Sequence, residues 1–263
     1  MVNVAIHGAA GRMGKRLIAL GHSAQEIELV AAVELDSHPE LGQDAGRLAG
    51  LAEIGLPLST EFPEQVDVVI DFSLPSAVDE IVRICRQRST AVVIATTGLS
   101  AATEDGIREA SQQIPIVWAP NMSLAVNLTM KLTEVVAAAL KQAAVDVDVE
   151  IIETHHRFKA DAPSGTALKF GELIGERLGI DRHQHGRHGD TGVRPRDEIG
   201  YHAVRAGDDA GRHTILFGML GEKIEVGVAA SNRDCYASGA LMAARFLHGK
   251  PAGLYSMYDV LGL

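Results

Sequence analysis

A glycine-rich turn between an apolar strand and a helix is the feature that most restricts the fold of this chain. Residues 2–6 are apolar and predict a short buried strand, and Gly8, Gly11 and Gly14 follow it in a GxxGxxG arrangement. Glycines at such a turn let the backbone approach a pyrophosphate at the N-terminus of the next helix, which the pattern predicts from residue 15. Alone, this signal is weak, because many proteins join strands to helices through glycine turns.

An acidic residue after the next apolar run strengthens this signal. Residues 27–33 predict a second strand, and Glu34 stands at its end, 20 residues after Gly14. A carboxylate there can accept hydrogen bonds from adenosine ribose hydroxyls, whereas proteins that bind a 2′-phosphate usually offer an arginine. Because Leu35 follows Glu34, the pattern favours NADH. It leaves NADPH open, because Arg12 in the glycine turn could contact the 2′-phosphate. The alternative is an ordinary βαβ unit with Glu34 in solvent.

Strand and helix patterns continue to alternate after Glu34. Further strands are predicted at residues 66–72, 91–95 and 114–118, with a helix from the Ser73-Leu74-Pro75 cap to about Gln87 and another over residues 101–112. This alternation predicts an α/β fold with a Rossmann-type parallel sheet and helices on both faces. Ligands of such sheets bind at the carboxyl ends of the strands. In this chain those ends carry residues 8–13, Glu34, residues 71–73, residues 96–98 and residues 119–122.

The pattern changes after residue 122. A long helix is predicted over residues 123–144, then a strand over residues 147–153, and residues 181–200 predict a mobile surface loop. Three strand-like runs follow, separated by Gly-Asp and Leu-Gly-Glu turns that suit antiparallel strands. These runs are residues 201–206, 213–219 and 223–230.

Two domains follow from this change of pattern. The first covers residues 1–121, is rejoined by residues 236–263, and would bind the dinucleotide. The second covers residues 122–235 and is expected to be an α+β domain with a mainly antiparallel or mixed sheet. It would bind the substrate, and the face of its sheet could pair with another subunit.

The stretch from residue 155 to residue 166 carries the most reactive groups. His155, His156, Arg157 and Lys159 stand just before a helix that Ser164 is expected to cap. Cations and the free N–H groups of a helix start together predict a pocket for a small, multiply anionic ligand, and the imidazoles and amine could move protons there. The alternative is a solvated loop. Arg233 could complete the pocket, or be a surface charge.

Composition and charge restrict the kinds of partner that the protein can bind. A formal net charge of −10 argues against a nucleic-acid partner. The chain shows neither a signal-peptide pattern nor 18 consecutive apolar residues, which predicts a cytoplasmic protein without a membrane partner. Cys85 and Cys235 imply no disulfide framework. His183, His185 and His188 invite interpretation as metal ligands, but they lack a regular spacing on one element, and no metal site is predicted.

Residues 4–14 and 155–167 together resemble the 4-hydroxy-tetrahydrodipicolinate (dihydrodipicolinate) reductase family. The resemblance extends over the whole chain, with residues 71–73, 96–98 and 119–121 where the family has such segments. It implies NAD(P)H-dependent reduction of 4-hydroxy-tetrahydrodipicolinate, a cyclic imine dicarboxylate, to tetrahydrodipicolinate in lysine and diaminopimelate biosynthesis. It also implies a homotetramer formed through the sheet of the second domain.

The resemblance assigns roles residue by residue. His155 and Lys159 would be the catalytic proton-transfer groups. The cofactor would contact Gly8, Ala9, Ala10, Gly11, Arg12, Met13, Glu34, Phe72, Ala95, Thr96, Thr97, Ala119, Pro120, Asn121 and Met122. The dicarboxylate would contact His156, Lys159, Ser164, Gly165, Thr166 and Arg233.

Two residues depart from the family pattern, and two other functions stay open. Leu35 replaces an arginine that good NADPH users often carry, and Phe158 replaces a residue that is often polar. A different Rossmann-type dehydrogenase, acting on an amino or hydroxy acid, would use the same cofactor crevice. A cofactor-sensing binding protein would need neither His155 nor Lys159.

Overall fold

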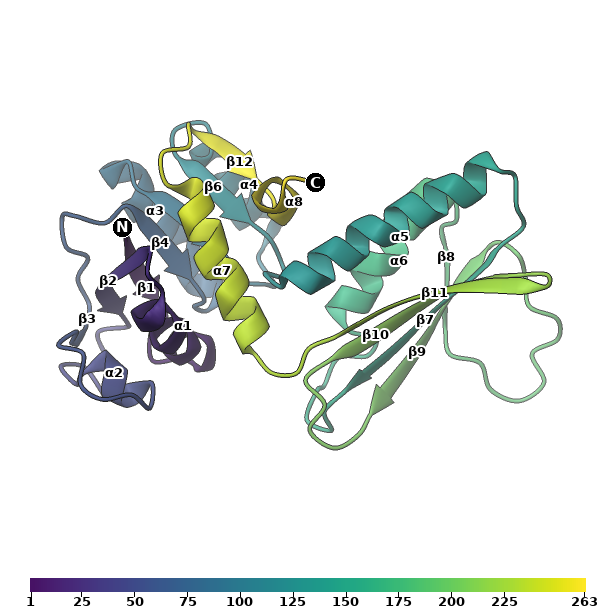
Figure 1. The fold of residues 1–263 in the computed structure, drawn as a ribbon, viewed down its shortest axis with the longest axis horizontal. Helices are drawn as coiled ribbons and strands as arrows, with labels where there is room; N and C mark the ends of the chain where they lie inside the picture. Colours follow the sequence, from purple (N-terminus) through teal and green to yellow (C-terminus); the bar gives the residue numbers. More distant parts are fainter. The chain divides into compact units, whose positions relative to one another are not determined.

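The computed structural model describes residues 1–263 and divides them into two units (Figure 1). The first unit contains Met1–Leu124 and Arg233–Leu263, and the second contains Ala125–Asn232. The chain therefore leaves the first unit after Leu124 and returns to it at Arg233.

A parallel sheet of seven strands forms the first unit, as the alternation predicted. In spatial order the strands are β12 (Gly253–Tyr255), β6 (Pro115–Trp118), β5 (Ala91–Ile94), β4 (Val68–Asp71), β1 (Val2–His7), β2 (Ile27–Val33) and β3 (Leu58–Ser59). All neighbouring pairs are parallel. The edge strands β3 and β12 were not predicted, because runs of two and three residues are too short to show a periodic pattern.

Helices cover both faces of this sheet. The helices of the first unit are α1 (Arg12–Ser23), α2 (Ala45–Leu48), α3 (Val78–Arg88), α4 (Ala101–Ala110), α7 (Asp234–Leu247) and α8 (Met257–Leu261). One core cluster joins the sheet to α1 and α7, and includes Ile6, Leu17 and Leu247. The other joins it to α3 and α4, and includes Val92, Ile81 and Ile107. All of these side chains are buried, so apolar burial fixes the layer order.

The prediction that Ser73 caps the helix after β4 is wrong. Pro75–Ala77 forms a short 3-10 turn, and α3 begins after it without a side-chain cap. The hydroxyl of Ser73 instead donates to the carboxylate of Asp71 over 2.6 Å.

A mixed sheet of five strands forms the second unit, in the order β11-β10-β7-β9-β8. The strands are β7 (Asp148–His155), β8 (Arg182–His185), β9 (Glu198–Arg205), β10 (Arg212–Met219) and β11 (Glu222–Ala229), and the helices of this part of the chain are α5 (Leu124–Gln142) and α6 (Gly165–Leu178). The β10–β11 pair is antiparallel, as the Leu-Gly-Glu turn predicted.

The sheet is mixed, one of the two arrangements expected for this unit, but β9 and β10 do not pair with each other. β7 lies between β9 and β10, so the segment that joins these two strands crosses the carboxyl end of β7. There the amide N–H of His156 donates to Asp209, and that of Arg157 donates to Gly207. The expected loop over residues 181–200 also contains β8, which pairs in parallel with β9.

The helix α6 packs closely against this sheet. A side chain at Gly171 would overlap the Tyr201 hydroxyl, and one at Gly175 would overlap the Ile180 carbonyl. Phe170 and Ile174 on α6 are fully buried, as are Ile151 and Ile199 on the sheet. No helix in the structure combines the length and apolar character needed to cross a membrane.

Candidate functional site

A cavity of about 590 Å³ lies at the carboxyl ends of the strands in the first unit. This is the edge where ligands of open parallel sheets bind. The lining residues are His7, Gly8, Gly11, Arg12, Met13, Glu34, Leu35, Phe72, Ser73, Leu74, Ser76, Ala77, Ala95, Thr96 and Thr97. The cavity thus collects the glycine turn and the ends of β1, β2, β4 and β5.

The glycine turn has the close packing that a nucleotide phosphate site needs. A side chain at Gly14 would overlap the carbonyl oxygens of Gly8 and Ala9, so only glycine allows α1 to approach β1 this closely. Gly11 caps α1 without a side-chain hydrogen bond. The N–H groups of the first turn of a helix lack partners within the helix and favour an anion. The residues present therefore fit a dinucleotide.

Asp71 holds three residues that line this cavity, and it was not among the predicted site residues. Its fully buried carboxylate lies 2.6 Å from His7 Nδ1 and accepts hydrogen bonds of 2.6 Å from the hydroxyls of Ser73 and Thr96. The carboxylate thus ties together the ends of β1, β4 and β5. The signal in the sequence was an acidic residue at the end of the apolar run that forms β4.

The cavity does not include every predicted cofactor residue. Ala9 and Ala10 lie in the glycine turn but do not line the cavity, and Ala9 is buried in the core. Residues 119–122 follow β6 and do not line the cavity either. Contact of these residues with a cofactor stays a prediction.

In the second unit, β7 presents a buried histidine–carboxylate pair. Glu153 and His155 are two residues apart on a strand and therefore share a face. The Nδ1 atom of His155 lies 2.5 Å from Oε2 of Glu153, and both residues are buried. Burial alone would raise the pKa of Glu153, but hydrogen bonds from Arg205 and His155 hold it below its usual value. Glu153 is therefore an anion in the folded protein.

Ser164 caps α6, as predicted, and it also contacts a histidine that was not predicted. Its hydroxyl oxygen accepts from the Ala167 N–H over 3.2 Å and lies 3.0 Å from His213 Nε2. The rings of His213 and His155 form a T-shaped, edge-to-face contact with centroids 5.2 Å apart. Neither Glu153 nor His213 was predicted as a site residue, but in each case the available signal was a polar residue on the buried face of a strand.

The remaining predicted substrate residues lie partly in the second unit and partly in the first. Lys159 forms an ion pair with Asp161 over 2.9 Å and is partly exposed. The Nδ1 atom of His156 is buried without a hydrogen-bond partner. Gly165 and Thr166 form the first turn of α6. Arg233 is exposed and precedes α7 in the first unit, so its contact with substrate stays a prediction.

The histidines of residues 183–188 have structural contacts in this structure. His183 Nδ1 lies 2.7 Å from the Tyr201 hydroxyl, and the rings of His183 and His185 stack on the Tyr201 ring. No group of three or more His, Cys, Asp or Glu side chains is arranged to hold a metal ion.

Because of His213, we expect the folded protein to lose stability at acidic pH. Burial, followed by the charge of His155, lowers the pKa of His213 to about 4. In the unfolded chain a histidine titrates near about 6.5, so the folded state binds fewer protons between these values. Stability should therefore fall as the pH decreases from about 6.5 to about 4, and His213→Gln should remove part of that slope.

Urea unfolding at a series of pH values measures this effect. His188→Gln, which replaces an exposed histidine in the same unit, is the matched control and should retain the wild-type slope. An unchanged slope in His213→Gln would contradict the prediction.

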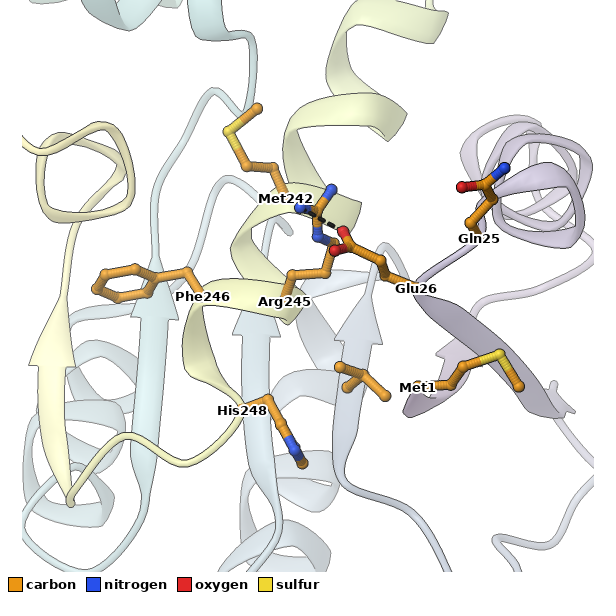
Figure 2. Close-up of a pocket in the computed structure, with 8 residues that line it drawn as sticks. Met1, Gln25, Glu26, Met242, Arg245, Phe246 and His248 are labelled. Atoms are coloured by element: carbon orange, nitrogen blue, oxygen red, sulfur yellow. Dashed lines mark ion pairs between the residues drawn. The ribbon is translucent and has the colours of Figure 1, made fainter.

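A second cavity, of about 620 Å³, lies near the amino ends of β1 and β2 (Figure 2). Figure 2 shows the ion pair between Glu26 and Arg245 on its wall, with Met242, Phe246 and His248 on the same helix end. This edge is opposite to the one where ligands of parallel sheets bind. We assign it no ligand.

Comparisons with known proteins agree with this geometry. Residues 2–122 match the family model described as dihydrodipicolinate reductase, N-terminus, and residues 125–261 match that described as dihydrodipicolinate reductase, C-terminus. A 4-hydroxy-tetrahydrodipicolinate reductase of Rhodopirellula baltica is 57% identical over 270 aligned positions, covering 100% of this chain and 96% of the relative. One of Alkalilimnicola ehrlichii is 47% identical, covering 99% of this chain and 98% of the relative.

Solved structures show the same fold. Dipicolinate-bound dihydrodipicolinate reductase from Paenisporosarcina sp. TG-14 superposes with a TM-score of 0.78 at 26% identity, covering 98% of both chains. An amine dehydrogenase from Mycobacterium smegmatis superposes with a TM-score of 0.62 at 11% identity, covering 97% of this chain and 95% of the other, and shares the fold alone.

A Rossmann-type unit with a glycine turn that fits a dinucleotide, joined in one chain to a unit with a buried histidine–carboxylate pair, is typical of a nicotinamide-dependent oxidoreductase. Family models that together match nearly the whole chain, with relatives 47–57% identical, specify the family. The chain belongs to the dihydrodipicolinate reductase family.

Proposed function

We propose that this chain catalyses the NAD(P)H-dependent reduction of 4-hydroxy-tetrahydrodipicolinate to tetrahydrodipicolinate in lysine and diaminopimelate biosynthesis. The observation that carries the proposal is the arrangement at the end of β7. A histidine paired with a buried carboxylate lies beside a Ser164-capped helix start, with Lys159 between them in sequence. A reductase of a dicarboxylate needs both an anion-binding site and a proton source.

The proposed substrate-binding residues are all hydrogen-bond donors, which suits a ligand with two carboxylates. Ser164, Gly165 and Thr166 offer a hydroxyl and the N–H groups of a helix start to a carboxylate. His156 and Arg233 are further donors in this proposal. Two carboxylates on a rigid ring would be fixed at two points, which orients the reacting carbon. The dipicolinate-bound relative supports a planar dicarboxylate as the ligand class.

The nicotinamide cofactor supplies the hydride, and the residues of this chain supply the accompanying proton. Lys159 is the proton donor, and its charge stabilises negative charge that develops on the ring. His155 exchanges a proton through the ring nitrogen that Glu153 does not contact. The hydroxyl of the substrate leaves as water, so one hydride and one proton are taken up, and one water is lost, on the way to tetrahydrodipicolinate.

The cofactor is held by the cavity of the first unit. The first turn of α1 would bind the pyrophosphate and Glu34 the adenosine ribose, as the glycine turn and the end of β2 suggest. NADH is the proposed preference, because Leu35 lines the cavity where an arginine would contact a 2′-phosphate. The protein is proposed to act in the cytoplasm as a homotetramer.

Leu35→Arg should shift this preference. A guanidinium at this exposed position gives a 2′-phosphate a charge-assisted hydrogen bond, so kcat/KM for NADPH should rise about tenfold relative to NADH. Steady-state rates with both cofactors measure the ratio. Leu220→Arg adds the same charge at a fully exposed turn of the second unit and should leave the ratio unchanged. An unchanged ratio of kcat/KM values in Leu35→Arg would show that the 2′ position of the adenosine ribose does not lie near residue 35.

The test of the function is the oxidation of NADH and NADPH by the purified protein, with and without enzymatically prepared 4-hydroxy-tetrahydrodipicolinate. Consumption that depends on this compound supports the proposal. Binding of both cofactors without consumption would overturn it, and would favour a sensor or a dehydrogenase for another substrate.

A further inference from the structure

Glu153 is a buried carboxylate to which the proposed function gives no role of its own. We infer that Glu153 is a positioning residue, which fixes the tautomer of His155 and ties this imidazole to the start of α6. The inference rests on the proposed role of His155 in proton transfer. It adds a residue that acts through His155 rather than on the substrate.

The hydrogen bonds around Glu153 decide the tautomer. Oε1 accepts from the amide N–H of Ser164 over 3.1 Å, and the Arg205 guanidinium donates to both oxygens over 2.7 and 2.8 Å. A carboxylate with these donors is ionised and can only accept, so His155 Nδ1 must carry the proton in the contact of 2.5 Å. The basic lone pair of the neutral ring is then on Nε2.

The space around Nε2 is kept open by a glycine. A Cβ atom on Gly211 would lie 2.9 Å from His155 Nε2, and the φ angle of Gly211 is +138°, which side chains rarely adopt. The amide N–H of Gly211 donates to Oδ1 of Asp209 over 3.0 Å, which fixes this turn. Any residue other than glycine would crowd the atom that Glu153 leaves available.

The same carboxylate joins the two functional parts of the site. One oxygen is hydrogen-bonded to the N-cap residue of α6, and the other to the imidazole. A shift of either part would break one of these bonds within the buried cluster. Glu153 therefore sets the distance between the proton-transfer group and the proposed carboxylate-binding turn, the geometry that proton transfer to an already bound dianion needs.

The charge around His155 comes from several elements. Glu153 faces it from β7, Arg205 reaches the same carboxylate from β9, and His213 lies edge-on from β10. Lys159 follows on the segment after β7. Glu153 is the one anion in direct contact with the ring, so its removal takes away the negative charge nearest to the imidazole.

Glu153→Gln keeps the shape of the side chain and removes its charge. It should lower kcat about 10²-fold or more, because the amide no longer enforces one tautomer, while KM for the dicarboxylate changes little. The apparent acidic pKa of the kcat/KM profile should also move to lower pH. A purely structural role would not move this pKa.

Glu150→Gln is the matched control on the same strand. Burial would raise the pKa of Glu150, but Arg187, Arg194 and His202 hold it to about 2. This variant thus also removes a carboxylate with arginine partners, but one without a hydrogen bond to His155. It should retain the wild-type pH profile. A pH shift in Glu150→Gln equal to that in Glu153→Gln would overturn the inference.

A double-mutant cycle with His155→Ala separates the inference from the proposed function. If Glu153 acts through His155, Glu153→Gln should cost almost nothing in the His155→Ala background. A full additional loss would overturn the positioning role. A normal rate in His155→Ala alone would instead overturn the proposed proton transfer, and a low rate there with a normal rate in Glu153→Gln would overturn only the inference.

Gly211→Ala tests the same inference if Glu153→Gln does not fold. It should lower kcat by crowding Nε2 while leaving the carboxylate cluster in place. Gly207→Ala is its control, because Gly207 lies in the same segment, also has a positive φ angle (+55°), and has open space around a Cβ atom. Equal rates in the two variants would overturn the assignment of Nε2 as the working atom.

Discussion

Lys159→Met should lower kcat of the proposed reduction by about 10²- to 10⁴-fold, the range that a positioned acid contributes. Methionine keeps much of the length and apolar stem of lysine but has no proton to give. Steady-state rates with saturating cofactor measure the loss. Lys159→Arg should recover substrate binding more than turnover, because an arginine carries the charge but does not release a proton at neutral pH.

Lys169→Met is the control for this result. Lys169 is a half-exposed lysine on α6 that pairs with Glu172 over 3.0 Å, so its replacement removes a similar ion pair outside the site. It should leave turnover unchanged. A near-normal rate in Lys159→Met would show that the proton comes from another group, and the assignment of Lys159 would be wrong.

Gly14→Ala should nearly abolish cofactor binding. Its methyl group would overlap two backbone carbonyl oxygens, those of Gly8 and Ala9, and backbone cannot move aside as a side chain can. Either α1 moves away from β1, which deforms the phosphate-binding turn, or the unit loses stability. We expect the Kd for NADH to rise at least about 10²-fold, the effect of losing roughly 3 kcal/mol of phosphate contacts.

Fluorescence titration with NADH measures this loss, and thermal unfolding shows whether the fold survives. Gly106→Ala is the matched control, because Gly106 lies inside α4 with open space around a Cβ atom. There alanine should stabilise the protein by about 0.5–1 kcal/mol, the usual gain over glycine in a helix. A normal Kd in Gly14→Ala would contradict the close packing of the turn.

Local patterns predicted the first unit well. The strands β1, β2, β4, β5 and β6 were predicted, because each is a short apolar run that turn residues delimit. Parallel pairing then follows from the helices between them. The cavity at their carboxyl ends needed no information beyond this order.

Long-range pairing could not be predicted in the same way. The turn before Arg212 has the Gly and Asp residues that are typical of a hairpin. However, β7 separates β9 and β10, the two strands that this turn joins. Which strand occupies the centre depends on how apolar faces pack against α6, and nothing near the turn encodes this. The contact of Ser164 with His213, across 49 positions, depends on the same arrangement. Therefore the capping serine was predicted and its histidine was not.

The return of the chain to the first unit has a consequence for synthesis on the ribosome. The helix α7 packs on α1, and Arg16 pairs with Asp234 across 218 positions. The edge strand β12 comes from the same last segment. The N-terminus of a chain leaves the ribosome first. Residues 125–232 are therefore complete and free to fold while the first unit still lacks two helices, α7 and α8, and an edge strand. Nascent chains that stop before residue 233 should therefore be poor NADH binders, although they contain the whole glycine turn.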